Sequence, residues 1–120
     1  MDILLKYESF HDYFLIGVGS NFDEKFVEIN LMSDDGKRRM NACLNGASRL
    51  LVKDFIIQNI VYSMDLLSDF DSEEYKSALK ELDESYPWGR GKALRNIMII
   101  NATLGAEVIV EYESFEVKEV

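Results

Sequence analysis

The only histidine of the chain, His11, is the residue type best suited to move protons near neutral pH. It stands in the run Ser9-Phe10-His11-Asp12, so that a serine and an aspartate lie beside it. Catalytic triads, however, are assembled from distant segments, and neighbours in a strand point to opposite faces of a sheet. Any Ser-His-Asp or Cys-His arrangement would have to use this one histidine. We therefore expect His11 to be structural, bonded to the backbone or to Asp12, and we expect the chain not to be an enzyme.

Metal and cofactor motifs are also missing from the sequence. The segment 69–73 resembles the start of a calcium loop, but such a loop needs glycine at its sixth position and glutamate at its twelfth. Glu74 and Lys80 stand there instead, which leaves at most a weak, adventitious divalent-cation site. The glycine pairs at 17–19 and 89–91 are too short for a phosphate-binding fingerprint. With a single histidine and a single cysteine, we expect no metal site, no disulfide and no cofactor.

The distribution of charge is the most distinctive feature of the sequence. The chain carries 22 acids and 13 bases, a net charge of −9. Between residues 65 and 84, eight acids against two lysines give a net charge of −6 in twenty residues. A tryptophan follows in a basic, glycine-rich loop. The candidate partner-binding residues are therefore Asp65, Asp69, Asp71, Glu73, Glu74, Glu81, Asp83, Glu84 and Trp88.

Two interpretations of these acids stay open. The first is a solvated helix face, since the helix macrodipole favours acids at an N-terminus; this explains the acids at 71–74. It does not explain the acids at 81–84, which fall in the last turn, where negative charge is unfavourable. The second is a partner-facing surface whose carboxylates imitate nucleic-acid phosphates and steer a basic nuclease toward it. Trp88 is likewise either an interface anchor or a cover for the end of the helix.

Length, charge and apolar content limit the class of protein. A chain of 120 residues, 48% of them hydrophobic, is near the usual size of one domain, and we expect a single domain over residues 1–120. The negative charge argues against direct binding to nucleic acid or to an anionic membrane, which both require cationic surfaces. No apolar run approaches the roughly 20 residues that span a bilayer, and the start of the chain is too short and too acidic for a signal peptide. We expect a cytoplasmic protein, monomeric or homodimeric.

Most of the chain alternates between apolar and polar residues, which is typical of half-buried strands. Strands are expected at 13–18, 25–31, 38–44, 48–55, 59–66, 94–102 and 107–112. Asp35-Gly36 and Asn45-Gly46 are signals for tight turns. The strands between residues 25 and 66 are therefore predicted to form a four-strand antiparallel meander. Its last strand should carry Ile60, Tyr62, Met64 and Leu66 on one face.

The hydrophobic period changes at residue 70, where a helix is predicted. Its apolar residues recur at helical spacing and should pack on the sheet: Tyr75, Ala78, Leu79 and Leu82. We expect Asp71 to cap its N-terminus and Phe70 to pack on Tyr75. Pro87 should end the helix by about residue 85. The predicted fold is α+β, a twisted antiparallel sheet with one main helix packed across it.

The run Ser9-Phe10-His11-Asp12, the hairpins that follow it, Val52–Phe55 and Gln58–Val61 resemble small immunity proteins of bacterial toxin–immunity systems, including those of contact-dependent inhibition and polymorphic toxins. The similarity covers residues 9–67, and the segment that starts at Gly105 resembles the closing strand of such proteins. The resemblance implies a cytosolic inhibitor without enzymatic activity that binds its cognate toxin tightly. It supplies no fixed functional residues, because interfaces in these families diverge with their toxins.

The leading hypothesis is an immunity protein that covers the active site of a basic toxin, with a nuclease as the favoured target. A second hypothesis is an intracellular adaptor or homo-oligomer that pairs through an edge of its sheet. A third is a small enzyme or ligand carrier, which would need a cavity lined by Tyr62, Tyr75 or Trp88.

Overall fold

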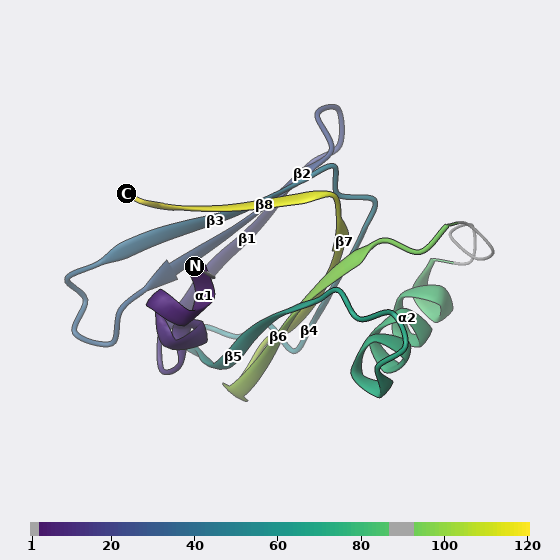
Figure 1. Ribbon diagram of the computed structural model, residues 1–120. Coiled ribbons are helices and arrows are strands. Elements are labelled where there is room, and N and C mark those ends of the chain that lie inside the picture. The colour runs from purple at the N-terminus through teal and green to yellow at the C-terminus, as the bar shows by residue number, and fades with distance from the viewer. Residues whose placement is uncertain (1–2, 87–92) are drawn as a thin grey trace.

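The computed structural model describes residues 3–86 and 93–120, and Trp88 lies outside them. In these residues an antiparallel sheet of eight strands carries one main helix (Figure 1), which confirms the predicted α+β class. The strands are β1 (Phe14–Asn21), β2 (Phe26–Met32), β3 (Arg39–Asn45), β4 (Arg49–Lys53), β5 (Asn59–Leu67), β6 (Asn96–Leu104), β7 (Glu107–Tyr112) and β8 (Ser114–Glu119). The helices are α2 (Glu73–Ser85), the short α1 (Ile3–Lys6) and a 3₁₀ turn, η1 (Glu8–Phe10).

The strand order is β4-β7-β6-β5-β1-β2-β3-β8, so β4 and β8 are the two edges among the described strands. β1, β2 and β3 form a meander, and the predicted turn at Gly36 joins the last two of them with a positive φ of 75°. β8 was not predicted, since the last expected strand ended at Tyr112. β8 pairs with β3, and its alternating Phe115 and Val117 lie opposite Leu44 and Ala42.

The fourth strand of the predicted meander lies elsewhere. β4 does not form a hairpin with β3 at Asn45-Gly46; it pairs instead with β7 at the opposite edge of the sheet. Gly46 has a positive φ of 64°, but the chain then leaves β3, and the amide of Ser48 donates to the carbonyl of Glu111. The physical reason is a side-chain match: Arg49, the first residue of β4, forms a buried ion pair with Glu111 of β7.

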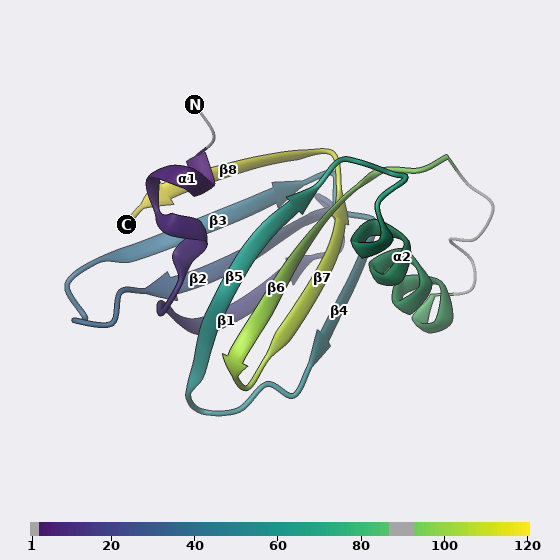
Figure 2. The ribbon, with the colours of Figure 1, turned by 60° about the horizontal axis from the view of Figure 1, so that its bottom comes forward.

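The sheet twists so strongly that side chains from β1, β2 and β3 share one core with side chains from β5, β6 and β7. Among its fully buried members are Leu15, Ile29, Leu31, Met64, Met98 and Ile100. α2 lies on the other face of the β4–β7–β6–β5 half (Figure 2) and builds a second, smaller core there. That core contains Leu67, Tyr75, Ala78, Leu82, Ile97 and Ile109.

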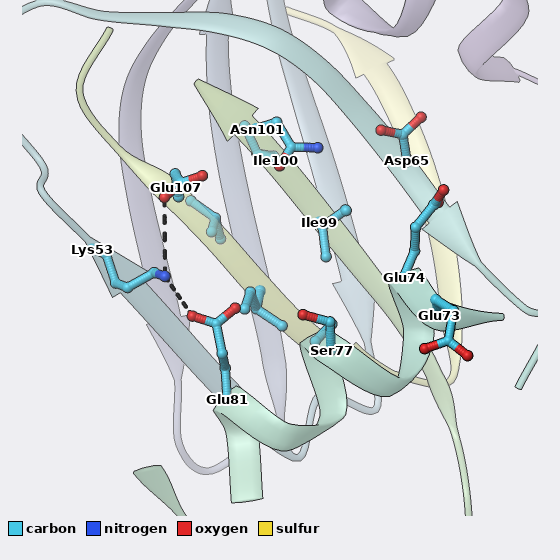
Figure 3. Close-up of a pocket in the computed structure, with 13 residues that line it drawn as sticks. Lys53, Asp65, Glu73, Glu74, Ser77, Glu81, Ile99, Ile100, Asn101 and Glu107 are labelled. Carbon is cyan, nitrogen blue, oxygen red and sulfur yellow. Dashed lines mark hydrogen bonds and ion pairs between the residues drawn. The ribbon is translucent and has the colours of Figure 1, made fainter. Parts of the chain in front are cut away.

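The predicted orientation of the β5 side chains is wrong in the first half of the strand. The pairing of β5 with β6 shifts register twice between Ile60 and Ser63, which marks a bulge. Val61 is therefore buried, whereas Tyr62 is 59% exposed. After the bulge, Met64 and Leu66 pack into the main core as predicted. The outward face of β5 carries the carboxylate of Asp65 (Figure 3).

The N-terminal segment packs against β5 through Phe10, which is completely buried. The backbone of η1 is left-handed, with a φ of 54° at Ser9, a conformation that costs free energy in a residue other than glycine. Burial of Phe10 offsets this cost. The turn also fixes His11, whose Nδ1 donates to the carbonyl of Tyr62 at 2.7 Å. The expectation that His11 is bonded to the backbone is confirmed.

α2 begins one residue later than the predicted cap implies. Ser72, and not Asp71, is the N-cap, and its hydroxyl accepts a hydrogen bond from the amide of Tyr75 at 3.1 Å. The predicted contact between Phe70 and Tyr75 is confirmed, with ring centroids 4.8 Å apart. The helix ends at Ser85, as expected.

Candidate functional site

A groove with a volume of about 670 Å³ runs between α2 and the outer face of the sheet (Figure 3). It is formed by residues of β4, β5, β6, β7 and α2. The polar side chains that line it are Lys53, Asp65, Glu73, Glu74, Ser77, Glu81, Asn101 and Glu107. The apolar residues that line it are Ala78, Ile99, Ile100, Val108 and Ile109. A groove of this size matches a side chain or a short segment of another molecule.

The groove exists because α2 covers only part of the sheet. Under the helix, the outward residues of the central strands are apolar, as at Ile97 and Ile109. Further along the same strands the outward residues become polar, namely Asn101 on β6 and Glu107 on β7. Since strand side chains alternate between faces, these residues cannot reach the core, and the helix does not extend over them.

The groove is acidic. Its described lining contains five carboxylates and one basic side chain, Lys53. Lys53 Nζ lies 2.5 Å from an Oε of Glu81 and 3.9 Å from an Oε of Glu107 (Figure 3). The hydrogen bond to Glu81 raises the pKa of the Lys53 ammonium above its ordinary value. Lys53 therefore stays charged at neutral pH and compensates part of the negative charge at its end of the groove.

Among the described residues, the other three carboxylates of the groove have no cationic partner. In the part of the chain that the structure describes, Asp65, Glu73 and Glu74 form no ion pair with a lysine, arginine or histidine. Asp65 accepts a hydrogen bond from the hydroxyl of Ser63 at 2.8 Å. Glu73 and Glu74 are exposed in the first turn of α2, where the helix macrodipole favours them. This end of the groove is therefore open to an external cation.

Two acids in the last turns of α2 form ion pairs with bases of the same chain. Asp83 pairs with Arg49, whose Nη1 lies 2.7 Å from a carboxylate oxygen, and Glu81 pairs with Lys53. Arg49 also binds Glu111, which accepts from Nε at 3.0 Å and from Nη2 at 2.8 Å. These pairs hold α2 to β4 and β7. They account for Glu81 and Asp83, two of the three acids that the helix macrodipole does not favour, but not for Glu84.

Glu111 stays ionised in this network. Burial by itself raises its pKa, but the hydrogen bonds from Arg49 and from the hydroxyl of Ser48 outweigh burial. The pKa of Glu111 is therefore held below its ordinary value. Among the described residues, no buried side-chain nitrogen or oxygen lacks a hydrogen-bond partner.

The predicted partner-binding residues thus divide into two groups. Asp65, Glu73, Glu74 and Glu81 line the groove, whereas Asp69, Asp71, Asp83 and Glu84 do not. The carboxylate of Asp69 accepts a hydrogen bond from the amide of Asp71, and so shapes the turn before the helix. Trp88 lies outside the described residues.

Sequence reasoning did not select Lys53 and Glu107. They lie 54 residues apart in the chain and meet only because β4 pairs with β7 in a register that places them opposite each other. The stretch 107–119 contains five acids, and this was a partial signal for Glu107. No pattern in the sequence pointed to Lys53.

Features that would support catalysis are few in the described part. His11 Nε2 lies 3.6 Å from a carboxylate oxygen of Asp12, and both side chains are about half exposed at a turn. Within residues 3–86 and 93–120, no three histidine, cysteine or acidic side chains lie close enough to hold a metal ion. Burial raises the pKa of the lone thiol, Cys43, which keeps it in the less reactive form. Tyr62 and Tyr75 do not line the groove.

Fold and site together define a small α+β protein with an acidic groove between its helix and its sheet. Comparison with models of protein families, with curated proteins and with solved structures gives no significant match. Over residues 3–86 and 93–120, no helix is long and apolar enough to cross a membrane.

Proposed function

We propose that this chain is an immunity protein, a binding protein that neutralises a cognate bacterial toxin of the nuclease class by covering its active site. The observation that carries the proposal is the groove beside α2, whose described lining contains five carboxylates and one lysine. The net charge of −9 on 120 residues supports it. The proposal includes a cytoplasmic location, where an inhibitor would meet an incoming toxin, and no enzymatic activity.

The physical argument is electrostatic complementarity. Active sites that bind nucleic acid present lysine and arginine to phosphates. Carboxylates of an inhibitor can take the place of those phosphates, speed up the encounter and pair with the same side chains. Asp65, Glu73 and Glu74 suit this role because their charges are not neutralised by bases in the described structure. Glu81 and Asp83 suit it less, since they already bind Lys53 and Arg49.

The test is co-expression of this chain with the C-terminal domain of the large secreted protein encoded directly upstream of its gene. We expect that domain to stop growth when expressed alone. We expect this chain to restore growth and to co-elute with the domain in size-exclusion chromatography. Toxicity without rescue, or the absence of any such upstream gene, would overturn the proposal.

The open sheet favours a second candidate, an adaptor or homo-oligomer that pairs through a strand edge. β4 and β8 each have a described neighbour on one side only. β8, however, carries the exposed charged residues Glu116, Lys118 and Glu119, and charges on an edge strand oppose pairing with another chain. Multi-angle light scattering of the isolated chain distinguishes the two functions: a stable dimer that forms without any toxin supports the second.

A further inference from the structure

An apolar loop is exposed at the end of the sheet, where the chain passes from β4 to β5. Phe55 is 47% exposed, Ile56 is 45% exposed, and Ile57 is fully exposed. Leu104, the last residue of β6, is 44% exposed. We call these four residues the apolar tip. Scattered exposed apolar residues are ordinary, but a run of three beside a fourth is typical of an interaction site.

The tip is held in place by a buried amide. Asn59 is 2% exposed, and its Oδ1 accepts from the amides of both Ile56 and Ala106, at 3.0 and 2.9 Å. Its Nδ2 donates to the carbonyls of Ile56 and Leu15. One side chain thus joins the loop to the β6–β7 turn and to β1, and Figure 2 shows the β4–β5 connection beside that turn at the lower end of the sheet. A loop fixed before binding loses little conformational entropy when a partner covers it.

A close approach of the backbone adds to this fixation. Gly105 has a positive φ of 82°, and a Cβ at this position would lie 2.3 Å from Oδ1 of Asn59 and 3.0 Å from a side-chain carbon of Ile56. The turn can therefore sit against the loop only because residue 105 is glycine. Although the Ile56 side chain reaches this contact, it remains 45% exposed, and Phe55 and Ile57 are still more exposed.

The charge near the tip decides which partner fits. The tip follows Asp54 directly, and Lys53 and Glu107, at the near end of the acidic groove, adjoin its two segments in the chain. A second copy of the chain would bring two bodies of net charge −9 together, which is unfavourable. A protein with a basic surface around an apolar recess matches both the tip and the groove.

We infer that the apolar tip is the hydrophobic anchor of the interface, and that it inserts into an apolar recess on a basic protein partner while the groove binds the basic residues at the rim of that recess. The inference rests on the proposed function, since the partner is then the toxin. It adds an apolar surface, whose residues were not among those selected for their charge. Interfaces commonly depend on a few buried apolar anchors, with charges around them that set the rate and the specificity of association.

The test measures binding of the full chain to the purified upstream toxin domain, carrying an inactivating substitution, by isothermal titration calorimetry. The variants are Ile57→Ser in the tip and Phe22→Ser as the matched control. Phe22 is 83% exposed in the β1–β2 turn, at the opposite end of β1 from Asn59. Both side chains are exposed, so neither change should disturb the fold, and urea unfolding of each variant verifies this.

We expect Ile57→Ser to raise the dissociation constant roughly ten- to a hundredfold. This is the range for removing one buried aliphatic side chain from an interface. Phe22→Ser should bind like the wild type. Equal affinity of Ile57→Ser and the wild type would overturn the anchor while leaving the proposed function intact. Failure of the wild type itself to bind would overturn both. A stable dimer of the free chain that Ile57→Ser dissolves would identify a second copy as the occupant and also overturn the inference.

Discussion

Arg49 and Glu111 bind each other through two hydrogen bonds, from Nε and Nη2 of the guanidinium to the two carboxylate oxygens, in the layer between the sheet and α2. Their side chains are 4% and 9% exposed. Asp83 of α2 binds the remaining terminal nitrogen of Arg49. Two strands that lie far apart in the chain and the helix above them are therefore joined by a single guanidinium.

The first prediction is that Arg49→Met strongly destabilises the protein. The change leaves Glu111 buried without its cationic partner, and removal of one member of a buried ion pair costs about 3–5 kcal/mol. Lys53→Met is the control, because Lys53 forms ion pairs that are more than a third exposed, and such pairs contribute at most about 1 kcal/mol. Urea denaturation followed by circular dichroism gives both values. Similar losses in the two variants would contradict the role assigned to Arg49.

The second prediction concerns acid. The pKa of Glu111 is lowered in the folded protein, so its contribution to the free energy of unfolding is complete above its ordinary value of 4.5. That contribution is lost as the pH falls through the lower pKa of the folded state. The difference in stability between the wild type and Glu111→Gln should therefore shrink as the pH is lowered from 7 to below 4.5. Urea titrations across this range measure it, and a constant difference would disprove the linkage.

The third prediction distinguishes the two possible caps of α2. Ser72→Ala removes the hydroxyl that accepts from the amide of Tyr75 and should cost about 1 kcal/mol. Asp71→Ala should cost less than about 0.5 kcal/mol, since its side chain is exposed and does not cap the helix. Thermal or urea unfolding of the two variants compares them directly. A larger loss of stability for Asp71→Ala than for Ser72→Ala would show that Asp71 caps the helix, as expected from the sequence.

The fourth prediction tests the amide that fixes the apolar tip. Asn59→Ala leaves the amide of Ala106 buried without an acceptor, which costs about 1–3 kcal/mol. It also frees the amide of Ile56, so hydrogen exchange at both amides should become faster. Gln58→Ala, at an exposed neighbouring position, is the control and should leave both exchange rates unchanged. Unchanged protection at Ala106 in Asn59→Ala would show that the loop is held by other contacts.

The sequence predicted those parts of the fold that depend on local patterns. Alternation located β2 and β3, and helical spacing located α2 with its Phe70–Tyr75 contact. The position of β4 could not be predicted, because it depends on a match between Arg49 and Glu111 across 62 residues. Asn45-Gly46 is compatible with a hairpin and also with the departure of the chain toward the other edge, so the turn signal did not decide between them.

The candidate site was predicted only in part, because some of its residues depend on long-range contacts and others on local patterns. The acids at the start of α2 were found as a charge cluster, and their position at the groove follows from the helix itself. The roles of Glu81 and Asp83 depend on bases in β4, which are 28 and 34 residues away. The motifs that suggested a family have structural roles in this fold: Phe10 and Asn59 are buried, and the amide of Asp12 donates to the carbonyl of Val61. They fix β1 beside β5.

The fifth prediction separates the charge of the groove from the charge of the chain. Glu73→Gln combined with Glu74→Gln removes two carboxylates from the groove, and Asp23→Asn combined with Glu24→Gln removes two from the exposed β1–β2 turn. Both double variants have the same net charge. If the groove is the surface that attracts a basic toxin, only the first should slow association markedly, because nearby charges set the rate of an electrostatically steered encounter.

The measurement is the association rate constant with the inactivated upstream toxin domain, taken by stopped flow at several salt concentrations. The wild type should slow down as salt screens its carboxylates, and the groove variant should show a weaker dependence on salt. The turn variant should follow the wild type. Glu73 and Glu74 are exposed, so their replacement leaves no buried group unpaired, and a slower rate reports on the encounter and not on a damaged fold. Equal slowing by both double variants would assign the steering to the net charge of the chain and remove the groove from the interface.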